Sequence, residues 1–434
     1  MNEIKINNYE KLNEKVYSKV LNNGLKVIVI PKKGFGKYFA SFTTEFGGND
    51  TGYIDPITNE KHLFPSGVAH FLEHKMFSMP TEDGRIEDVT LQFSNLGIDA
   101  NAFTDYFRTS YIISGSKNFE EGLNLLIDYV QTPYFMEKDA NKEKGIIIQE
   151  YKTYMDEPDE ILALRIKRNI YAKAFTKDIL GNIKDIKSIN SDILNTAYDI
   201  FYHPSNMNLV ITGDLDPYKV IELVENNQNN KNYQLREKPK HITYEENKKI
   251  IKSKKIKIDA KMDIVKMAVR IDKNEFDENE LLYFETKMNI ILELLCGPMS
   301  KNYQEMLDKD LITSFSYSIR IDDKYHPYLY FSTKSNKSLE FVKYFKKLIK
   351  NIDKLQIKEE DFSLMKKGLI GQSMMATNVI DDTVITLTEY LIKNADLFAC
   401  VSNYNDLTVE EVKEMIKYIN YDNLSYVIGK GSSE

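Results

Sequence analysis

The apolar and polar positions of the first fifty residues predict a small sheet. They follow a strand pattern from Val16 to Pro31 around an Asn-Asn-Gly turn at 22–24, and a third strand-like run covers Tyr38 to Phe46. The polar, proline-punctuated segment 49–65 predicts a loop. This loop leads to a helix for which Ser66 is the expected N-cap.

That helix carries three residues with metal chemistry. Within residues 66–77, the pattern His70-x-x-Glu73-His74 puts two imidazoles one turn apart on one face, with Glu73 beside them. This order is the inverted form of a zinc-peptidase motif. The helix is apolar nearly all round, which predicts burial, and a buried Glu between two core histidines is costly without a partner. Because a bound cation removes that cost, we favour a metal site over core histidines.

The next segments predict a hairpin between helices. A helix is expected at 86–96, two strands joined by a short turn at 98–104 and 108–113, and another helix at 118–130. On its pattern alone, the pair of strands is a plain hairpin of the core sheet.

A second long helix offers carboxylates. It is expected from about residue 139 to 155, and in it Glu143 and Glu150 are two turns apart and face the same way. A zinc site needs a third protein ligand, which a carboxylate can supply. A single helical Glu is nevertheless more often simply solvated.

The end of the chain repeats a pattern from its middle. A helix, a polar turn, a strand and a Gly follow one another at 192–213, and again at 409–431. Aligning Asn208 with Asn423, 215 residues later, predicts an internal duplication. The helix expected at 278–295 takes the place of the histidine-bearing helix but contains no His.

Residues 225–255 separate the two copies. This stretch is rich in Asn, Lys and Glu and low in hydrophobicity, as exposed linkers are. Its lysines could suit an anionic partner, but aromatic residues of the kind that single-strand binders use are few, so we favour a solvated connector.

The composition is that of a globular protein. The 434 residues are 42% hydrophobic and 28% charged, and their net charge of −7 argues against nucleic acid as a partner. Residues 1–15 lack the apolar segment of a secretory signal and no later run approaches a membrane span, so we expect a soluble protein with no membrane partner. Cys296 and Cys400 are too few for a disulfide framework, which favours a reducing, cytoplasmic location.

These residues together resemble the pitrilysin/insulinase family of zinc peptidases, which includes insulysin and the mitochondrial processing peptidase. The resemblance rests on His-x-x-Glu-His, on Glu150, which comes 76 residues after His74, on the Asn-Ala-Phe-Thr segment at 101–104, and on Asp-Glu-Pro at 156–158. These motifs lie between about Pro65 and Pro158.

The resemblance implies a role for each matching residue. His70, His74 and Glu150 would hold one Zn²⁺ per chain and leave a fourth position for water, Glu73 would be the general base, and Glu143 would orient a ligating His. The strand with Asn101, Ala102 and Phe103 would be a sheet edge to which a peptide substrate adds as an extra strand.

One part of the second half departs from the family. Its Gly-x-x-Ser segment, 297–300, resembles a family helix that commonly carries an Arg and, seven residues on, a Tyr that contact the substrate. Here Leu307 and Ser314 occupy those positions. We therefore expect a heterodimer in which a sister chain without the zinc motif supplies Arg and Tyr. Tyr317, three residues beyond Ser314, could replace the Tyr, so a homodimer stays open.

The resemblance implies an α+β fold of two homologous α/β domains in tandem, each a mostly antiparallel sheet packed with helices. We expect a zinc-bearing domain at 1–224, a linker at 225–255 and a non-metal domain at 256–434. The expected activity is that of a zinc metalloendopeptidase that hydrolyses peptides or leader segments in a dimeric clamshell chamber. The alternatives are a non-catalytic assembly subunit and a peptide-binding module with structural zinc, although Glu73 has no structural duty in the latter.

Overall fold

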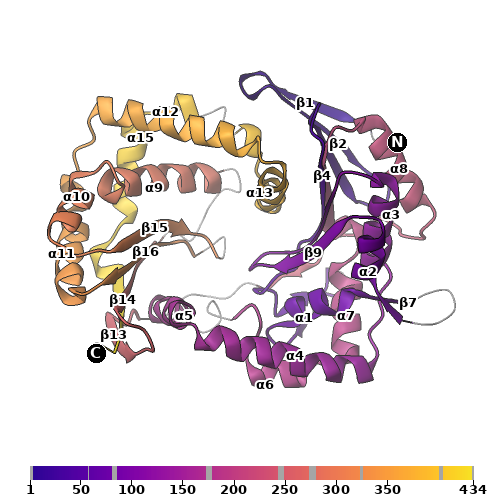
Figure 1. Cartoon of the computed structure of the whole chain (residues 1–434), viewed down its shortest axis with the longest axis horizontal. Helices are drawn as coiled ribbons and strands as arrows, with labels where there is room; N and C mark the ends of the chain where they lie inside the picture. The colour runs from indigo at the N-terminus through magenta and orange to yellow at the C-terminus, as the bar shows by residue number, and fades with distance from the viewer. Residues whose placement is uncertain are drawn as a thin grey trace.

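Two large sheets, each with its own helices, form the two halves of the chain (Figure 1), and the described residues also contain a three-stranded and a two-stranded sheet. The computed structural model describes residues 3–56, 58–80, 86–172, 178–242, 249–272, 280–322, 326–399 and 404–432. The strands expected before residue 50 all belong to the first sheet, as their alternation predicts.

The first sheet has seven strands, in the order β1 (Lys5–Tyr9), β2 (Glu14–Val20), β3 (Lys26–Pro31), β11 (Met207–Gly213), β4 (Tyr38–Thr44), β10 (Thr109–Gly115) and β9 (Asp99–Thr104). The second sheet has five, in the order β13 (Ser253–Lys257), β17 (Leu424–Lys430), β14 (Asp263–Arg270), β16 (Tyr328–Ser335) and β15 (Ser314–Arg320). Strand β11 is parallel to β3 and β17 is parallel to β13, whereas all other neighbours in these sheets are antiparallel.

The α-helices of the first half are α1 (Val68–Met76), α2 (Val89–Asn95), α3 (Phe119–Val130), α4 (Glu137–Asp156), α5 (Pro158–Ile170), α6 (Ile183–Ser188), α7 (Ser191–Phe201) and α8 (Pro217–Asn229). Those described in the second half are α9 (Glu280–Cys296), α10 (Lys301–Asp308), α11 (Ser338–Lys350), α12 (Glu359–Ala376), α13 (Ile380–Ile392) and α15 (Val409–Lys413). Within the described ranges, no helix combines the length and apolar character needed to cross a membrane.

The two halves share one topology. The order β3-β11-β4-β10-β9 in the first sheet matches β13-β17-β14-β16-β15 in the second, including the single parallel pair of each. Along the chain, α1, α3, α4 and α5 follow the same strands as α9, α11, α12 and α13. The expected duplication is therefore visible in the fold, and α9 takes the place of α1.

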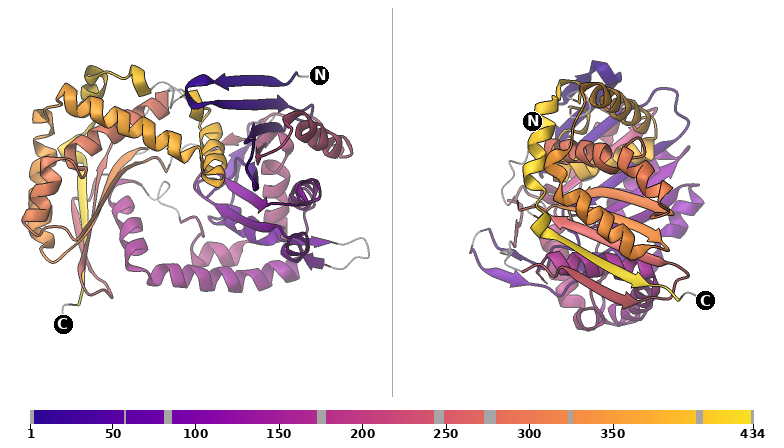
Figure 2. Two further views of the ribbon diagram at one scale, coloured as in Figure 1. Left: turned by 45° about the horizontal axis from the view of Figure 1, so that its top comes forward. Right: turned by 90° about the vertical axis from the view of Figure 1, so that its left-hand side faces the viewer.

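Each half covers one face of the other half's sheet. Helix α13 packs Ile380, Val384 and Leu387 against Ile28 and Phe39 of the first sheet. The equivalent helix α5 packs against β14 and β17 of the second sheet through Leu162, Ile166 and Ile170. Figure 2 shows α12 and α13 along one side of the molecule, and α4 and α5 along the other.

Several local predictions need correction. The expected loop 49–65 contains two paired strands, β5 (Gly52–Ile54) and β6 (Lys61–Leu63). The expected helix 86–96 starts with a strand, β8 (Ile86–Asp88), which pairs with β7 (Ser78–Pro80), so α2 begins only after it.

The stretch expected as a linker, 225–255, holds the end of α8, β12 (Lys240–His241) and the start of β13. Its residues 243–248, like Cys400, lie outside the described residues.

Candidate metal centre

Helix α1 begins at a glycine. Gly67 is the N-cap, with a φ of 91° that L side chains rarely adopt, and a Cβ there would lie 2.4 Å from the carbonyl oxygen of Leu180. The expected N-cap, Ser66, makes no cap hydrogen bond; its hydroxyl instead donates to Asp185. Glycine therefore lets the chain enter α1 where only backbone fits.

The apolar residues of α1 fix the direction of its histidines. Val68, Phe71 and Leu72 are buried in the core of the first half. This packing holds His70 and His74 together on another side of the helix, with ring centroids 4.6 Å apart. His70 is buried and His74 is partly exposed, so a ligand between them can reach solvent on one side.

Helix α4 brings the third group. Glu150 Oε1 lies 3.7 Å from His70 Nε2, and Glu150 Oε2 lies 3.4 Å from His74 Nε2. Ligands bound to zinc at about 2.0–2.2 Å in a tetrahedron are roughly 3.5 Å apart, so this spacing suits one Zn²⁺. His70, His74 and Glu150 form the one such cluster found within the described ranges, with candidate ligand atoms within 4.8 Å of one another.

Glu143 lies behind the cluster rather than in it. Its Oε1 is 3.1 Å from His74 Nδ1, a contact in which an Nδ1–H donates and the Nε2 lone pair is left for a metal. Burial alone would lower the pKa of His74, but hydrogen bonds to Glu143 and Glu150 outweigh it and raise the pKa to about 9. The hydrogen bond from His74 in turn lowers the pKa of Glu143 and that of Glu150.

His70 differs electrostatically from His74. Burial, followed by the charge of His74, lowers the pKa of His70 to about 4, so its imidazole is neutral at pH 7 as a metal ligand must be. Its Nδ1 is buried and has no hydrogen-bond partner among the described residues. No side-chain contact there fixes which nitrogen carries the proton.

Glu73 lies beside the cluster and bonds to a strand. Thr104 Oγ1 is 2.5 Å from Glu73 Oε2. Burial raises the pKa of Glu73, and the Thr104 hydrogen bond opposes this. A carboxylate whose pKa is raised is a stronger proton acceptor than an ordinary one. No role could be predicted for Thr104, because no spacing rule links a strand residue to a helix residue 31 positions away.

The expected peptide-binding strand lies at a sheet edge. Strand β9, with Asn101, Ala102 and Phe103, pairs with β10 on one side and ends the first sheet on the other. The backbone N–H of Ala102 donates to Asn101 Oδ1 at 2.9 Å, so the side chain of its own neighbour covers this donor. An added strand that pairs there must first displace the Asn101 amide.

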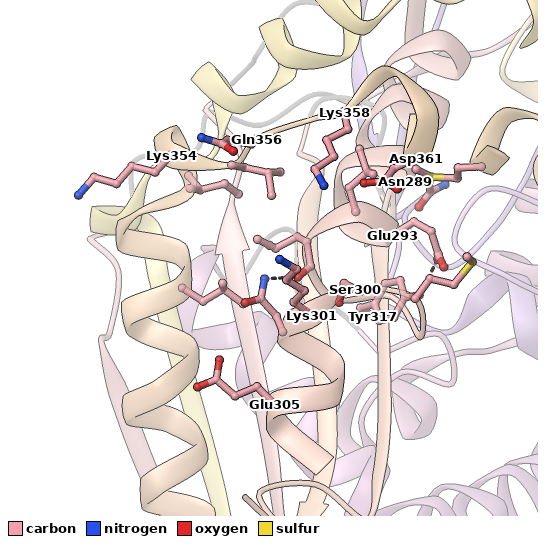
Figure 3. Close-up of a pocket in the computed structure, with 18 of the residues that line it drawn as sticks. Asn289, Glu293, Ser300, Lys301, Glu305, Tyr317, Lys354, Gln356, Lys358 and Asp361 are labelled. Carbon is pink, nitrogen blue, oxygen red and sulfur yellow. Dashed lines mark hydrogen bonds between the residues drawn. The ribbon is translucent and has the colours of Figure 1, made fainter. Parts of the chain in front are cut away.

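In the second half, the equivalent helices line a cavity. About 1160 Å³ of space lies between α9, α10, α11 and α12 (Figure 3), and Glu293 and Tyr317 line it. Tyr317 Oη donates to Glu293 Oε2 at 2.6 Å. Leu307 is an exposed residue in the last turn of α10, and Ser314 is the first residue of β15.

Comparison with known proteins decides the family. The model described as Insulinase (Peptidase family M16) matches residues 64–183, and the one described as Peptidase M16 inactive domain matches residues 188–369. A Bacillus subtilis protein named an uncharacterized zinc protease, YmfH, is 36% identical to this chain over 94% of it and 95% of its own length. The chain belongs to peptidase family M16, the insulinase family.

Other M16 proteins agree with this assignment. The crystal structure of an M16-like peptidase from Alicyclobacillus acidocaldarius superposes with a TM-score of 0.90 at 25% identity, over 96% of this chain and 99% of that one. The mitochondrial-processing peptidase subunit beta of Bos taurus is 28% identical, but over only 38% of this chain and 34% of its own. The expected family and the two-domain α+β fold are thus confirmed.

Proposed function

We propose that this M16 protein is a zinc metalloendopeptidase whose centre is His70, His74 and Glu150. The observation that carries this proposal is the convergence of two histidines and a carboxylate from α1 and α4, with Glu73 beside them. That close relatives are named zinc proteases supports the choice of metal.

The proposed chemistry uses Glu73 as the base. Zinc in this position supplies Lewis acidity, which brings the pKa of a bound water to about 7 and polarises a carbonyl. Glu73 would take the proton of the water as the water oxygen bonds to the peptide carbonyl carbon, and would return it to the amine as the C–N bond breaks. The Glu143 contact holds the His74 ring so that Nε2 faces Glu150.

The proposed substrate is an extended peptide or leader segment. It would lie along β9 at Asn101, Ala102 and Phe103, where backbone pairing gives affinity with little demand on sequence. Two observations support this placement: β9 is an edge strand, and its last residue, Thr104, bonds to Glu73.

The proposed assembly is a dimeric clamshell chamber in the cytoplasm, with a sister chain that lacks the zinc motif. The exposed Leu307 and the Ser314 at the positions expected for Arg and Tyr favour a partner that supplies both. The bovine relative named as a subunit of a processing peptidase is consistent with this arrangement. In the second candidate assembly, a homodimer, Tyr317 would replace the missing Tyr.

A non-catalytic assembly or peptide-binding subunit with structural zinc is the second candidate function. It is favoured by the match of residues 188–369 to a domain described as inactive. Against it stands Glu73, which lies outside the ligand cluster and would have no role in a structural site.

The test compares the purified chain with its Glu73→Gln variant on a mixed peptide library, read by mass spectrometry, with zinc content measured in both. We expect one zinc per chain in each protein, cleavage by the wild type together with its sister chain, and no cleavage by the variant under the same conditions. Cleavage by the purified wild type alone would instead favour the homodimer. If both proteins bind zinc but neither cleaves a peptide, even when co-expressed with a sister chain, the non-catalytic candidate would be favoured.

A further inference from the structure

One hydrogen bond to the proposed base comes from the peptide-binding strand. Thr104 is the last residue of β9, and its hydroxyl contacts Glu73 Oε2. An ionised carboxylate has no hydrogen to give, so the hydroxyl donates whenever Glu73 acts as a base. Hydrogen bonds to a charged acceptor are roughly twice as strong as neutral ones.

The two oxygens of Glu73 are thereby made unequal. Among the described residues, Oε2 accepts from Thr104 while no hydrogen bond reaches Oε1. The hydrogen bond lowers the basicity of Oε2, so Oε1 is the more basic oxygen for the proton that Glu73 takes up, and the bond to Oε2 can persist before and after the transfer.

Thr109, the neighbour of Thr104 on β10, leaves the hydroxyl hydrogen of Thr104 available for Glu73. Thr109, opposite Thr104 in the β9–β10 pair, has its hydroxyl 3.2 Å from that of Thr104. Thr109 donates its one hydrogen to the carbonyl of Phe46 at 2.9 Å. Thr109 therefore has no hydrogen left to donate to Thr104 and can only accept from it. Of the two acceptors beside the Thr104 hydroxyl, Glu73 is the stronger, because it is charged when it acts as a base and lies at 2.5 Å rather than 3.2 Å.

The hairpin that ends β9 is anchored from both halves. The Asp105 carboxylate accepts from the backbone N–H of Phe107 and from the Arg108 side chain, at 2.8 Å in each case. Arg108 also donates to the carbonyl of Ile385 and to Thr388 Oγ1 in α13, at 2.9 and 2.6 Å. The backbone that carries Thr104 is therefore fixed relative to α1 and to the second half.

We propose that Thr104 is a positioning residue for hydrolysis, which holds Glu73 Oε2 so that Oε1 alone is presented as the base. The inference rests on the proposed peptidase function. A misplacement of a reacting group by 1 Å costs about 100-fold in rate, and this sets the expected size of the effect.

The test uses three variants. Thr104→Val keeps the shape and removes the hydroxyl, Thr104→Ser keeps the hydroxyl, and Thr333→Val is the matched control. Thr333 is a buried threonine beside the edge strand of the second sheet that donates to the carbonyl of Ser314 at 2.6 Å. Its loss costs one buried hydroxyl bond without touching Glu73.

Thr104→Val is expected to lower kcat by about 10- to 100-fold while KM and zinc content stay unchanged. Thr104→Ser and Thr333→Val should have kcat close to that of the wild type. A wild-type kcat in Thr104→Val, or a Ser variant as slow as the Val variant, overturns the inference.

Crystal structures of the metal-free proteins give a second readout that does not need activity. Glu73 should be ordered in one rotamer in the wild type and in Thr104→Ser, and disordered or rotated in Thr104→Val. If Glu73 depends on Thr104 but the wild type cleaves nothing even with a sister chain present, the peptidase function fails and the contact stands. If the wild type cleaves and Glu73 is unmoved in Thr104→Val, this inference alone fails.

Discussion

Each half of the chain bonds a glutamate of a helix to a hydroxyl of its edge strand. In the first half the hydroxyl of Thr104 in β9 bonds to Glu73 in α1, and in the second the hydroxyl of Tyr317 in β15 bonds to Glu293 in α9. Around Glu73, α1 and α4 are in contact and bring together the candidate ligands His70, His74 and Glu150. Around Glu293, α9 and α12 line a cavity of about 1160 Å³.

The hydroxyl–glutamate bond and the candidate metal ligands are therefore separate features. A helix glutamate bonded to a hydroxyl of the edge strand occurs in both halves, with the ligand cluster in the first and without it among the described residues of the second. What distinguishes the first half is the pair of histidines and the approach of α4, which brings Glu143 and Glu150 to them. A carboxyl group held by a strand is thus not sufficient for a metal site.

Removal of a proposed ligand from the first half should abolish zinc binding, the property that we expect to distinguish it from the second half. His74→Ala leaves two ligands, so we expect zinc affinity to fall by more than the roughly 10- to 100-fold typical of losing an outer contact, and hydrolysis to stop. Isothermal titration of the metal-free protein measures this. In the matched variant Glu293→Gln, zinc binding should be unchanged; weakened binding there would show that the second half contributes to the site.

A change behind the ligands should weaken the site without destroying it. Glu143→Gln removes the charge that His74 Nδ1 contacts, and we expect about 10- to 100-fold weaker zinc binding. Competition with a chelator of known affinity measures the loss. Unchanged affinity would mean that the packing of α1 alone orients His74.

Zinc binding should depend on pH through one histidine. Because His74 has a pKa of about 9 without metal, it carries a proton at pH 7 that zinc must displace, whereas His70, with a pKa of about 4, carries none. We therefore expect release of about one proton, and an affinity that rises about tenfold per pH unit from 6 to 8. Calorimetry in buffers of different ionisation enthalpy counts the protons; two protons, or none, would contradict these pKa values.

The smallest effect is expected at the hydroxyl of the second half. Tyr317→Phe removes the bond to Glu293 and should cost about 1 kcal/mol in the free energy of unfolding, with zinc content and cleavage unchanged. Denaturant unfolding and the peptide assay measure the two quantities. Loss of cleavage with unchanged stability would instead identify Tyr317 as a substrate contact and favour the homodimer.

Local spacing was enough to predict the ligand helices. His70, Glu73 and His74 lie within five residues of one helix, and Glu143 and Glu150 share a face of another, so the 3.6-residue period places each set correctly. That the two sets lie together in space was predicted only from the family resemblance, because no sequence period relates α1 to α4. The duplication was also readable, since both copies keep the order of strand and helix.

Contacts between distant segments could not be predicted. The Thr104–Glu73 bond, the cavity beside α9 and the packing of α13 on the first sheet each join residues from separate elements. The prediction of Ser66 as the N-cap of α1 was wrong for a related reason. Ser66 has the right side chain, but the close approach of Leu180 admits only Gly67 at the start of α1.

The exchange of α5 and α13 between the halves has a consequence for how the protein is made. The first sheet is complete at β11, yet the face containing Ile28 and Phe39 stays uncovered until α13, residues 380–392, has left the ribosome. At about 5–20 residues per second this delay is roughly 10–30 s. During that time an apolar sheet face is exposed to chaperones and to neighbouring nascent chains. The first half therefore cannot complete its folding until the second half has been synthesised.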